Sequence, residues 1–152
     1  MSGGADWHAH VTVATVVERE GRFLLVEEQA DEGIVLNQPA GHLDPGESLF
    51  TAAMRETLEE TGCEVELEAL LGISQYTSPA NGVTYLRSTF AARLLREHLN
   101  AELDKEILRT LWMTPAEMRA ESGRMRSPLV MASVEQYLAG QRWPLDLVKY
   151  IP

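Results

Sequence analysis

The feature of this sequence that most constrains its fold is a helix-forming run that carries charged residues at fixed spacings. Residues 48–61 contain no Gly or Pro and are rich in helix formers. Ser48 suits the start of a helix and Gly62 suits its end. We therefore expect a helix from Ser48 to Thr61, preceded by a loop from Leu36 to Glu47 whose prolines and glycines interrupt regular structure.

Three glutamates lie on one face of this expected helix. Glu56, Glu59 and Glu60 stand at i, i+3 and i+4, which places them within an arc of roughly 100°. Such like-charge crowding costs a few tenths of a kcal/mol per pair unless a cation offsets it. Mg²⁺ prefers oxygen ligands of this kind. A solvated helix face is the alternative interpretation, and the fixed spacings around the glutamates favour a metal site.

The other residues of this helix are expected to form two surfaces. One carries small side chains that let other groups approach closely, and the other faces the core. Ala52 and Ala53 fall on the glutamate side, where small side chains would let a loop and a substrate approach. The opposite side is expected to face the core through Phe50, Met54, Thr57 and Leu58.

The segment from Gly41 to Cys63 resembles the Nudix box, the signature of hydrolases that act on nucleoside diphosphates linked to another group. This resemblance implies an α/β (α+β) fold, an α/β/α sandwich with a mixed β-sheet between helices. It also implies Mg²⁺ as cofactor, with Mn²⁺ as a substitute. The implied metal ligands are Glu56, Glu59, Glu60 and the Ala40 carbonyl, with Arg55 paired to Glu47 or Glu59 to orient them. Thr57 and Cys63 depart from the bulky aliphatic residues usual in the family.

Further motifs resemble the bacterial NudJ phosphatase subgroup of that family. They are His10-Val-Thr-Val-Ala14, Asn37-Gln-Pro-Ala-Gly-His-Leu43, Arg126-Ser-Pro-Leu-Val130, Gly140-Gln-Arg142 and Pro144-Leu145. Members of the subgroup are phosphatases of nucleoside tri- and diphosphates and of thiamine-related pyrophosphates. The resemblance therefore implies a small phosphorylated substrate.

Several residues outside the box are candidates for the same site. Asp104 and Glu106 precede Trp112, where family members often bring an extra acid to the metal. Glu106 is the candidate fourth ligand or general base, or else a surface acid. The candidate substrate-binding residues are Gln38, Arg87, Arg126 and Tyr76, the two arginines because guanidinium groups bind phosphate oxygens bidentately. His42 is expected to touch substrate or to bond within its loop, and Cys63 to be buried.

The other elements follow from residue pattern. We expect strands at His10–Val17, Arg22–Glu27, Val65–Tyr76, Thr84–Leu95 and Leu108–Met113. Glu20-Gly21 supplies the turn of the first hairpin. Two later helices are expected to begin at Thr114-Pro115 and at Ser127-Pro128, the second running to Ala139.

Charge and cysteine content limit the environment and the partners. The net charge of −10 opposes binding to nucleic acid polymers and to anionic membranes. Cys63 is the only cysteine, which excludes an intrachain disulfide and favours a reducing compartment. With no signal-peptide pattern at the start, we expect a single domain spanning residues 1–152, cytoplasmic, as a monomer or homodimer.

The expected mechanism is attack of water on a metal-bridged diphosphate, with one glutamate accepting the proton. Two alternatives use the same fold. The first is a ligand-binding module without turnover, which retention of Arg55 and all three glutamates disfavours. The second is an isoprenoid diphosphate isomerase, which needs a positioned cysteine and glutamate. Cys63 directly follows the box instead of standing in a separate motif, and this disfavours the isomerase.

Overall fold

The computed structural model describes residues 6–152, and within that range it contains seven strands, three α-helices and two 3-10 helices. The strands are β1 His10–Arg19, β2 Arg22–Ala30, β3 Gly33–Asn37, β4 Ala40–His42, β5 Cys63–Thr77, β6 Thr84–Glu97 and β7 Ile107–Met113. The helices are α1 Leu49–Thr61, α2 Pro115–Ala120, α3 Pro128–Leu138, η1 Ser122–Arg124 and η2 Leu145–Leu147. All five strands, the two-residue turn and the three helices expected from the sequence are present.

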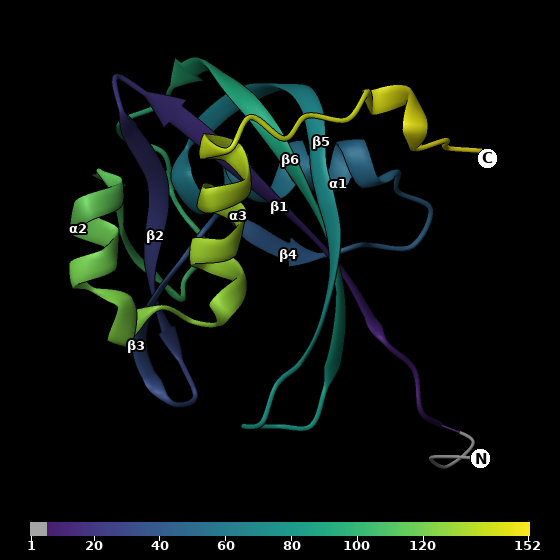
Figure 1. Ribbon diagram of the computed structural model, residues 1–152, viewed down its shortest axis with the longest axis horizontal. Coiled ribbons are helices and arrows are strands. Elements are labelled where there is room, and N and C mark those ends of the chain that lie inside the picture. Colours follow the sequence, from purple (N-terminus) through teal and green to yellow (C-terminus); the bar gives the residue numbers. More distant parts are fainter. Residues whose placement is uncertain (1–5) are drawn as a thin grey trace.

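The strands form one mixed sheet around β1. Its order is β3-β2-β1-β6-β5, with β4 pairing with β1 and β7 with β2. Strands β1 and β6 run parallel, and the other pairs run antiparallel. The β1–β2 turn places Glu20 and Gly21 at positive φ, as a two-residue hairpin turn requires. Because β1 pairs on both edges, it is the strand on which the other elements are arranged (Figure 1).

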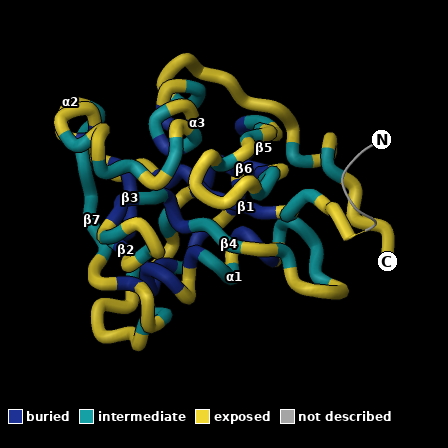
Figure 2. Tube along the Cα trace, turned by 90° about the horizontal axis from the view of Figure 1, so that it is seen from below, coloured by how far each residue is buried: buried dark blue, intermediate teal, exposed yellow. Residues whose placement is uncertain are grey.

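Helices cover both faces of this sheet, and β1 contributes to a core on each side. Val13 and Val17 pack with α1, whereas Val16 packs with α3 and α2, because alternate side chains of a strand point to opposite faces. Figure 2 shows buried strand segments between α3 on one side and α1 on the other. The expected mixed sheet between helices is therefore confirmed.

Helix α1 begins and ends as the sequence predicts, but it buries a different face. The Ser48 side chain accepts a hydrogen bond from the Thr51 N–H, and Gly62 closes the helix at φ 73°. The buried residues are Ala52, Ala53, Thr57, Glu60 and Thr61. The expected core stripe was therefore wrong for Met54 and Leu58, which are exposed. The alanines and the Thr57 hydroxyl, which lies 2.7 Å from that of Thr15, let the helix pack close to β1.

The segment expected to be a loop from Leu36 to Glu47 contains the end of β3 and all of β4. Leu36 pairs with Glu27 of β2, and Ala40 pairs with Ala14 of β1. These strands are short, each contains a glycine, and Pro39 stands between them, so the local sequence gives little strand signal and tertiary pairing overrides it. The expected loop is therefore wrong over β3 and β4.

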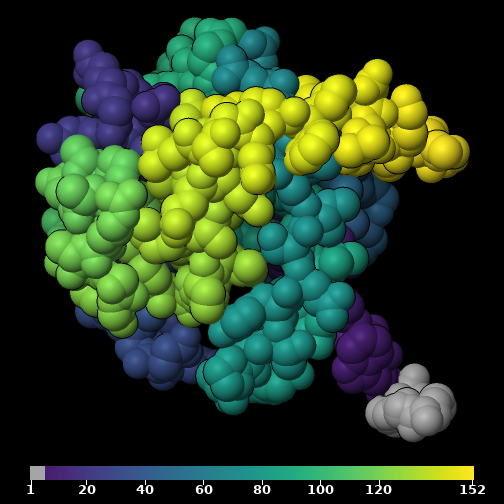
Figure 3. Space-filling model, in the orientation of Figure 1, coloured from purple at the N-terminus to yellow at the C-terminus, as the bar shows by residue number. Residues whose placement is uncertain are grey.

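The end of the chain packs back onto β5. After α3 the backbone of Trp143 exchanges two hydrogen bonds with that of Leu70, at 2.8 and 2.9 Å. Figure 3 shows this segment in yellow, running from α3 past the teal strand β5. Among residues 6–152, no helix has the length and apolar character needed to cross a bilayer.

Substitution of Gly62 tests how closely the end of α1 packs against the loop between β6 and β7. A Cβ at Gly62 would lie 2.7 Å from the His98 carbonyl oxygen, whereas Gly82 has a similar φ of 72° and open space around it. We expect Gly82→Ala to lower the free energy of unfolding by about 1 kcal/mol through backbone strain alone. Gly62→Ala adds a backbone collision and should cost about 3 kcal/mol or more. Urea denaturation measures both, and equal losses would contradict the close contact.

Candidate active site

A cleft of about 530 Å³ opens between α1, the β5–β6 hairpin and the start of α3. Its walls are strongly polar and come from segments far apart in the sequence. Of the candidate site residues, the cleft is lined by Ala40, His42, Glu56, Glu60, Tyr76, Arg87, Asp104, Glu106 and Arg126. The fold therefore brings most of the residues proposed from the sequence to one surface.

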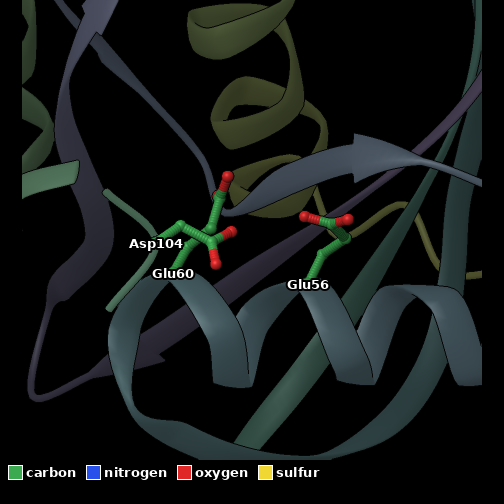
Figure 4. Close-up of side chains that lie close together, drawn as sticks. All are labelled: Glu56, Glu60 and Asp104. Carbon is green, nitrogen blue, oxygen red and sulfur yellow. The ribbon is translucent and has the colours of Figure 1, made fainter. Parts of the chain in front are cut away.

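Three carboxylates converge at one side of this cleft. Glu56 and Glu60 project from successive turns of α1, and Asp104 projects toward them from the loop before β7 (Figure 4). One oxygen from each of these side chains lies within 4.8 Å of the others. The Asp104 N–H donates to the Glu59 carbonyl oxygen at 3.1 Å, which fixes this loop against the last turn of α1.

Glu60 is the most deeply buried of the three carboxylates. Only 5% of the residue is exposed, and one carboxylate oxygen accepts the Ala40 N–H at 3.0 Å. Burial, aided by the nearby carboxylates of Glu28 and Glu56, raises the pKa of Glu60 to about 9. The folded protein therefore favours the protonated form of Glu60 when no cation is bound.

The Glu56 carboxyl group lies directly over Gly41 of β4, so any larger residue there would displace it. A Cβ on Gly41 would collide with the Glu56 carboxyl group. Burial raises the pKa of Glu56, although the adjacent Arg55 guanidinium opposes the shift. The glycine that opens the box therefore has a steric role, since it leaves space for a carboxylate over the strand.

Arg55 binds several acidic groups around the cluster. Its guanidinium donates to both oxygens of Glu47, at 2.6 and 2.9 Å, to Glu56 at 2.8 Å and to Glu59 at 3.0 Å. It also donates to the His42 carbonyl oxygen at 3.1 Å. These bonds hold the pKa of Glu47 below its usual range. Both partners proposed for Arg55 thus contact it, and Glu47 is joined to the cluster through Arg55.

The structure separates Glu59 and Glu106 from the closest group of carboxylates. The Glu59 side chain is 44% exposed and pairs with Arg55. Glu106 lines the cleft, but Asp104 is the residue of its loop that meets Glu56 and Glu60. Sequence reasoning recognised the loop and favoured the other acid, because the direction of each side chain depends on how the loop docks on α1.

Arg87 is buried, and Gln38 holds it in place. Arg87 Nη2 donates to Gln38 Oε1 at 2.9 Å, and Gln38 Nε2 donates to the Val130 carbonyl oxygen of α3 at 2.7 Å. Burial lowers the pKa of Arg87 to about 10, which leaves it charged at neutral pH. Among residues 6–152, no group bonds Arg87 Nε, although the side chain lines the cleft. Gln38, only 1% exposed, lies behind the cleft wall, so its contact with substrate is indirect.

Glu28 is a cleft residue that the sequence reasoning missed. It is 4% exposed, and one of its oxygens accepts a hydrogen bond from Arg126 at 3.0 Å. Burial raises the pKa of Glu28, and Arg126 opposes that shift. Its position in the alternation of β2, two residues after the buried Val26, was the available signal.

Comparisons with known proteins agree with this fold and site. A family model described as "NUDIX domain" matches residues 6–133. The phosphatase NudJ of Escherichia coli strain K12 is 39% identical over 139 residues, which cover 91% of this chain and 90% of that protein. The same figures hold for the phosphatase NudJ of Shigella flexneri. This chain therefore belongs to the Nudix family of hydrolases.

Solved structures agree with this assignment. A NUDIX hydrolase from Nitrosomonas europaea is 46% identical, has a TM-score of 0.92, and the match covers 95% of this chain and 98% of that one. A UDP-X diphosphatase, 19% identical with a TM-score of 0.73 over 92% of this chain and 68% of that one, shares the fold alone. Membership makes this protein a pyrophosphohydrolase or phosphatase of a family that uses divalent metals and small phosphorylated substrates.

The raised pKa of Glu60 predicts how metal-free protein responds to pH. A carboxyl group whose pKa is higher in the folded state binds its proton more tightly there, so its contribution to stability is lost as pH rises from about 4.5 to about 9. In EDTA, Glu60→Gln should therefore be more stable than wild type at pH 8, by at least about 1 kcal/mol. The two proteins should converge near pH 5. Thermal unfolding across this range measures the difference, and parallel curves would contradict it.

Proposed function

We propose that this protein catalyses the Mg²⁺-dependent hydrolysis of phosphoanhydride bonds in nucleoside di- and triphosphates or in thiamine-type pyrophosphates. The observation that carries the proposal is the convergence of Glu56, Glu60 and Asp104 in a cleft that also contains Arg87. Similarity to phosphatase NudJ supports a phosphatase reaction. Cation-binding carboxylates beside a buried guanidinium match a ligand that bears both phosphate and metal.

The carboxylate cluster fits a hard divalent cation. Its donors are all oxygen atoms, which suit Mg²⁺, with Mn²⁺ as a substitute. Burial raises the pKa of Glu56, Glu60 and Asp104, so each resists ionisation until a positive charge offsets the desolvation. We assign these three as the principal ligands. Glu59 and the Ala40 carbonyl oxygen are further candidate ligands. To bind the metal, the Glu59 carboxylate would first have to break its ion pair with Arg55.

The protein residues would orient the phosphates and accept a proton. A bound divalent ion would neutralise phosphate charge and lower the pKa of an attacking water. Glu106 is the proposed general base, because it lines the cleft without belonging to the closest carboxylate group. Arg55 and Glu47 hold the glutamates of α1 in position.

The phosphate side of the cleft is assigned to Arg87 and Arg126. Arg87 offers a buried Nε donor, and Arg126 precedes α3, whose start also lines the cleft. Arg126 already pairs with buried Glu28, so its removal would also leave a buried carboxylate without its cation. Tyr76 also lines the cleft and is proposed to contact the group attached to the phosphates.

The isomerase alternative conflicts with the position of Cys63. This thiol is fully buried in the core between α1 and the sheet, and burial raises its pKa. An isomerase of this fold would need a cysteine facing the substrate. A ligand-binding module without turnover is the remaining alternative, and the next experiment separates it from the enzyme.

Glu60→Gln should lower kcat by at least ~100-fold while the protein stays folded, because it removes a carboxylate that holds the metal. The assay uses nucleoside di- and triphosphates and thiamine pyrophosphate with Mg²⁺, and identifies both products. Glu64→Gln, at a solvent-exposed carboxylate on β5, is the matched control and should keep full activity. Absence of turnover by wild type on every substrate would favour the binding module.

Within the same assay, Asp104→Asn and Glu106→Gln distinguish ligand from base. We expect Asp104→Asn to raise the Mg²⁺ concentration required for half-maximal rate, and Glu106→Gln to lower kcat at saturating Mg²⁺. If the two variants exchange these effects, the assignments are reversed.

Arg87→Lys should raise KM about 10-fold with kcat within about 2-fold, because lysine keeps the charge but loses the Nε donor and the fixed bond to Gln38. Arg93→Lys, on the same strand with an exposed side chain, is the matched control. An unchanged KM in Arg87→Lys would show that this guanidinium does not bind substrate.

A further inference from the structure

Three histidines gather beside the cleft, at the start of β1 and the end of β4. His10 Nδ1 and His42 Nε2 are 3.0 Å apart. The ring of His8 stacks on that of His10, with centroids 5.4 Å apart and planes within 8°. Together they line a second hollow of about 450 Å³ that also contains Asp44 and Glu47. The hydrolase assignment gives no role to His8 or His10, and none to His42 beyond lining the cleft.

The antiparallel register of β1 and β4 brings these side chains together. Thr12 pairs with His42, so His10 and His42 are diagonal neighbours on one face of the strand pair. The Leu43 N–H donates to the Val11 carbonyl oxygen and continues the pairing beyond β4. Asp44 is two residues after His42, and its carboxylate is 63% exposed. Two imidazoles therefore meet where backbone pairing fixes the strands, whereas the Asp44 carboxylate lies 3.3 Å from Arg55 Nη2.

The separation of the two ring nitrogens suits a metal ion as well as a shared proton. Nitrogen ligands about 2.1 Å from one ion stand 3.0 Å apart when the angle between them is about 90°. That angle belongs to square-planar and octahedral coordination, whereas the tetrahedral geometry usual for Zn²⁺ separates the nitrogens further. Imidazole nitrogen in tetragonal geometry is characteristic of Cu²⁺ and Ni²⁺.

We propose that His10 Nδ1 and His42 Nε2 form a binding site for a late transition-metal ion of the Cu²⁺ or Ni²⁺ class. Water molecules complete the coordination. The site differs in chemistry from the carboxylate cluster of Glu56, Glu60 and Asp104, whose oxygen donors suit harder ions. The net charge of −10 favours cation binding at both places.

An ion at this site would join β1 to β4 next to the cleft. His42 lines both hollows, and its carbonyl oxygen accepts a hydrogen bond from Arg55 at 3.1 Å. Since the ion binds side chains that only the folded chain brings together, its binding stabilises the native state. The proposal is independent of the hydrolase reaction, because its tests measure coordination and stability.

Electron paramagnetic resonance of the full chain with one equivalent of Cu²⁺ tests the coordination. Excess Mg²⁺ is present so that the carboxylate cluster is occupied. We expect the copper signal of wild type to show coupling to two ring nitrogens, and the double variant His10→Gln/His42→Gln to lose that coupling. His98→Gln is the matched control, since His98 pairs with Glu64 on another part of the sheet, and it should give the wild-type spectrum. A wild-type spectrum without nitrogen coupling, or one retained in the double variant, overturns the site.

Ni²⁺ binding provides a second measurement without redox chemistry. In excess Mg²⁺, Ni²⁺ should raise the thermal midpoint of wild type and His98→Gln, and its affinity should fall at least ~10-fold in His10→Gln and in His42→Gln. Circular dichroism confirms that the variants are folded, which is expected because neither ring lies in the core. Equal Ni²⁺ affinity in wild type and both single variants would show that the pair shares only a proton.

Discussion

The contacts of Arg55 are the interaction on which the rest of the site depends. Its guanidinium bonds Glu47, Glu56 and Glu59 and reaches the His42 carbonyl oxygen, so one side chain connects the loop before α1, the helix and β4. Without it, the carboxylates of α1 would repel one another and leave the geometry of the cleft undefined. Because Arg carries several donors in one rigid plane, it can bind these acceptors at once, which a lysine ammonium on its flexible stem does less well.

The buried carboxylates of the site nevertheless lower the stability of the metal-free fold. Glu60 is buried near Glu28 and Glu56, and Arg55 does not reach it. Gly41 contributes no side-chain packing, so that Glu56 can lie over β4. A cluster that is unfavourable without a cation is well suited to binding one, since the ion then recovers the lost electrostatic energy. Function and stability therefore make opposite demands on the same carboxylates.

The substrate side of the cleft depends on a different kind of contact. Gln38 joins Arg87 of β6 to the Val130 carbonyl of α3, and Arg126 reaches Glu28 of β2. Both links pass between elements that are distant in the sequence. These links fix the start of α3 against the sheet and position two guanidinium groups at the cleft. The positive charge of these groups is opposite to that of the carboxylates of α1.

The sequence by itself determined the family, the extent of α1 with its Ser48 and Gly62 ends, and five of the seven strands described in the mixed sheet, all except β3 and β4. These follow from local chemistry: capping, backbone freedom of glycine and the spacing of charged residues along one helix. Tertiary structure alone decided that Asp104 meets Glu56 and Glu60, that Glu28 is buried, that Gln38 supports Arg87 from behind, and that His10 meets His42. It also decided that Ala52 and Ala53, not Met54 and Leu58, face the core. The physical reason is that residue spacing fixes directions within one element, whereas contacts between elements depend on how strands pair and loops dock.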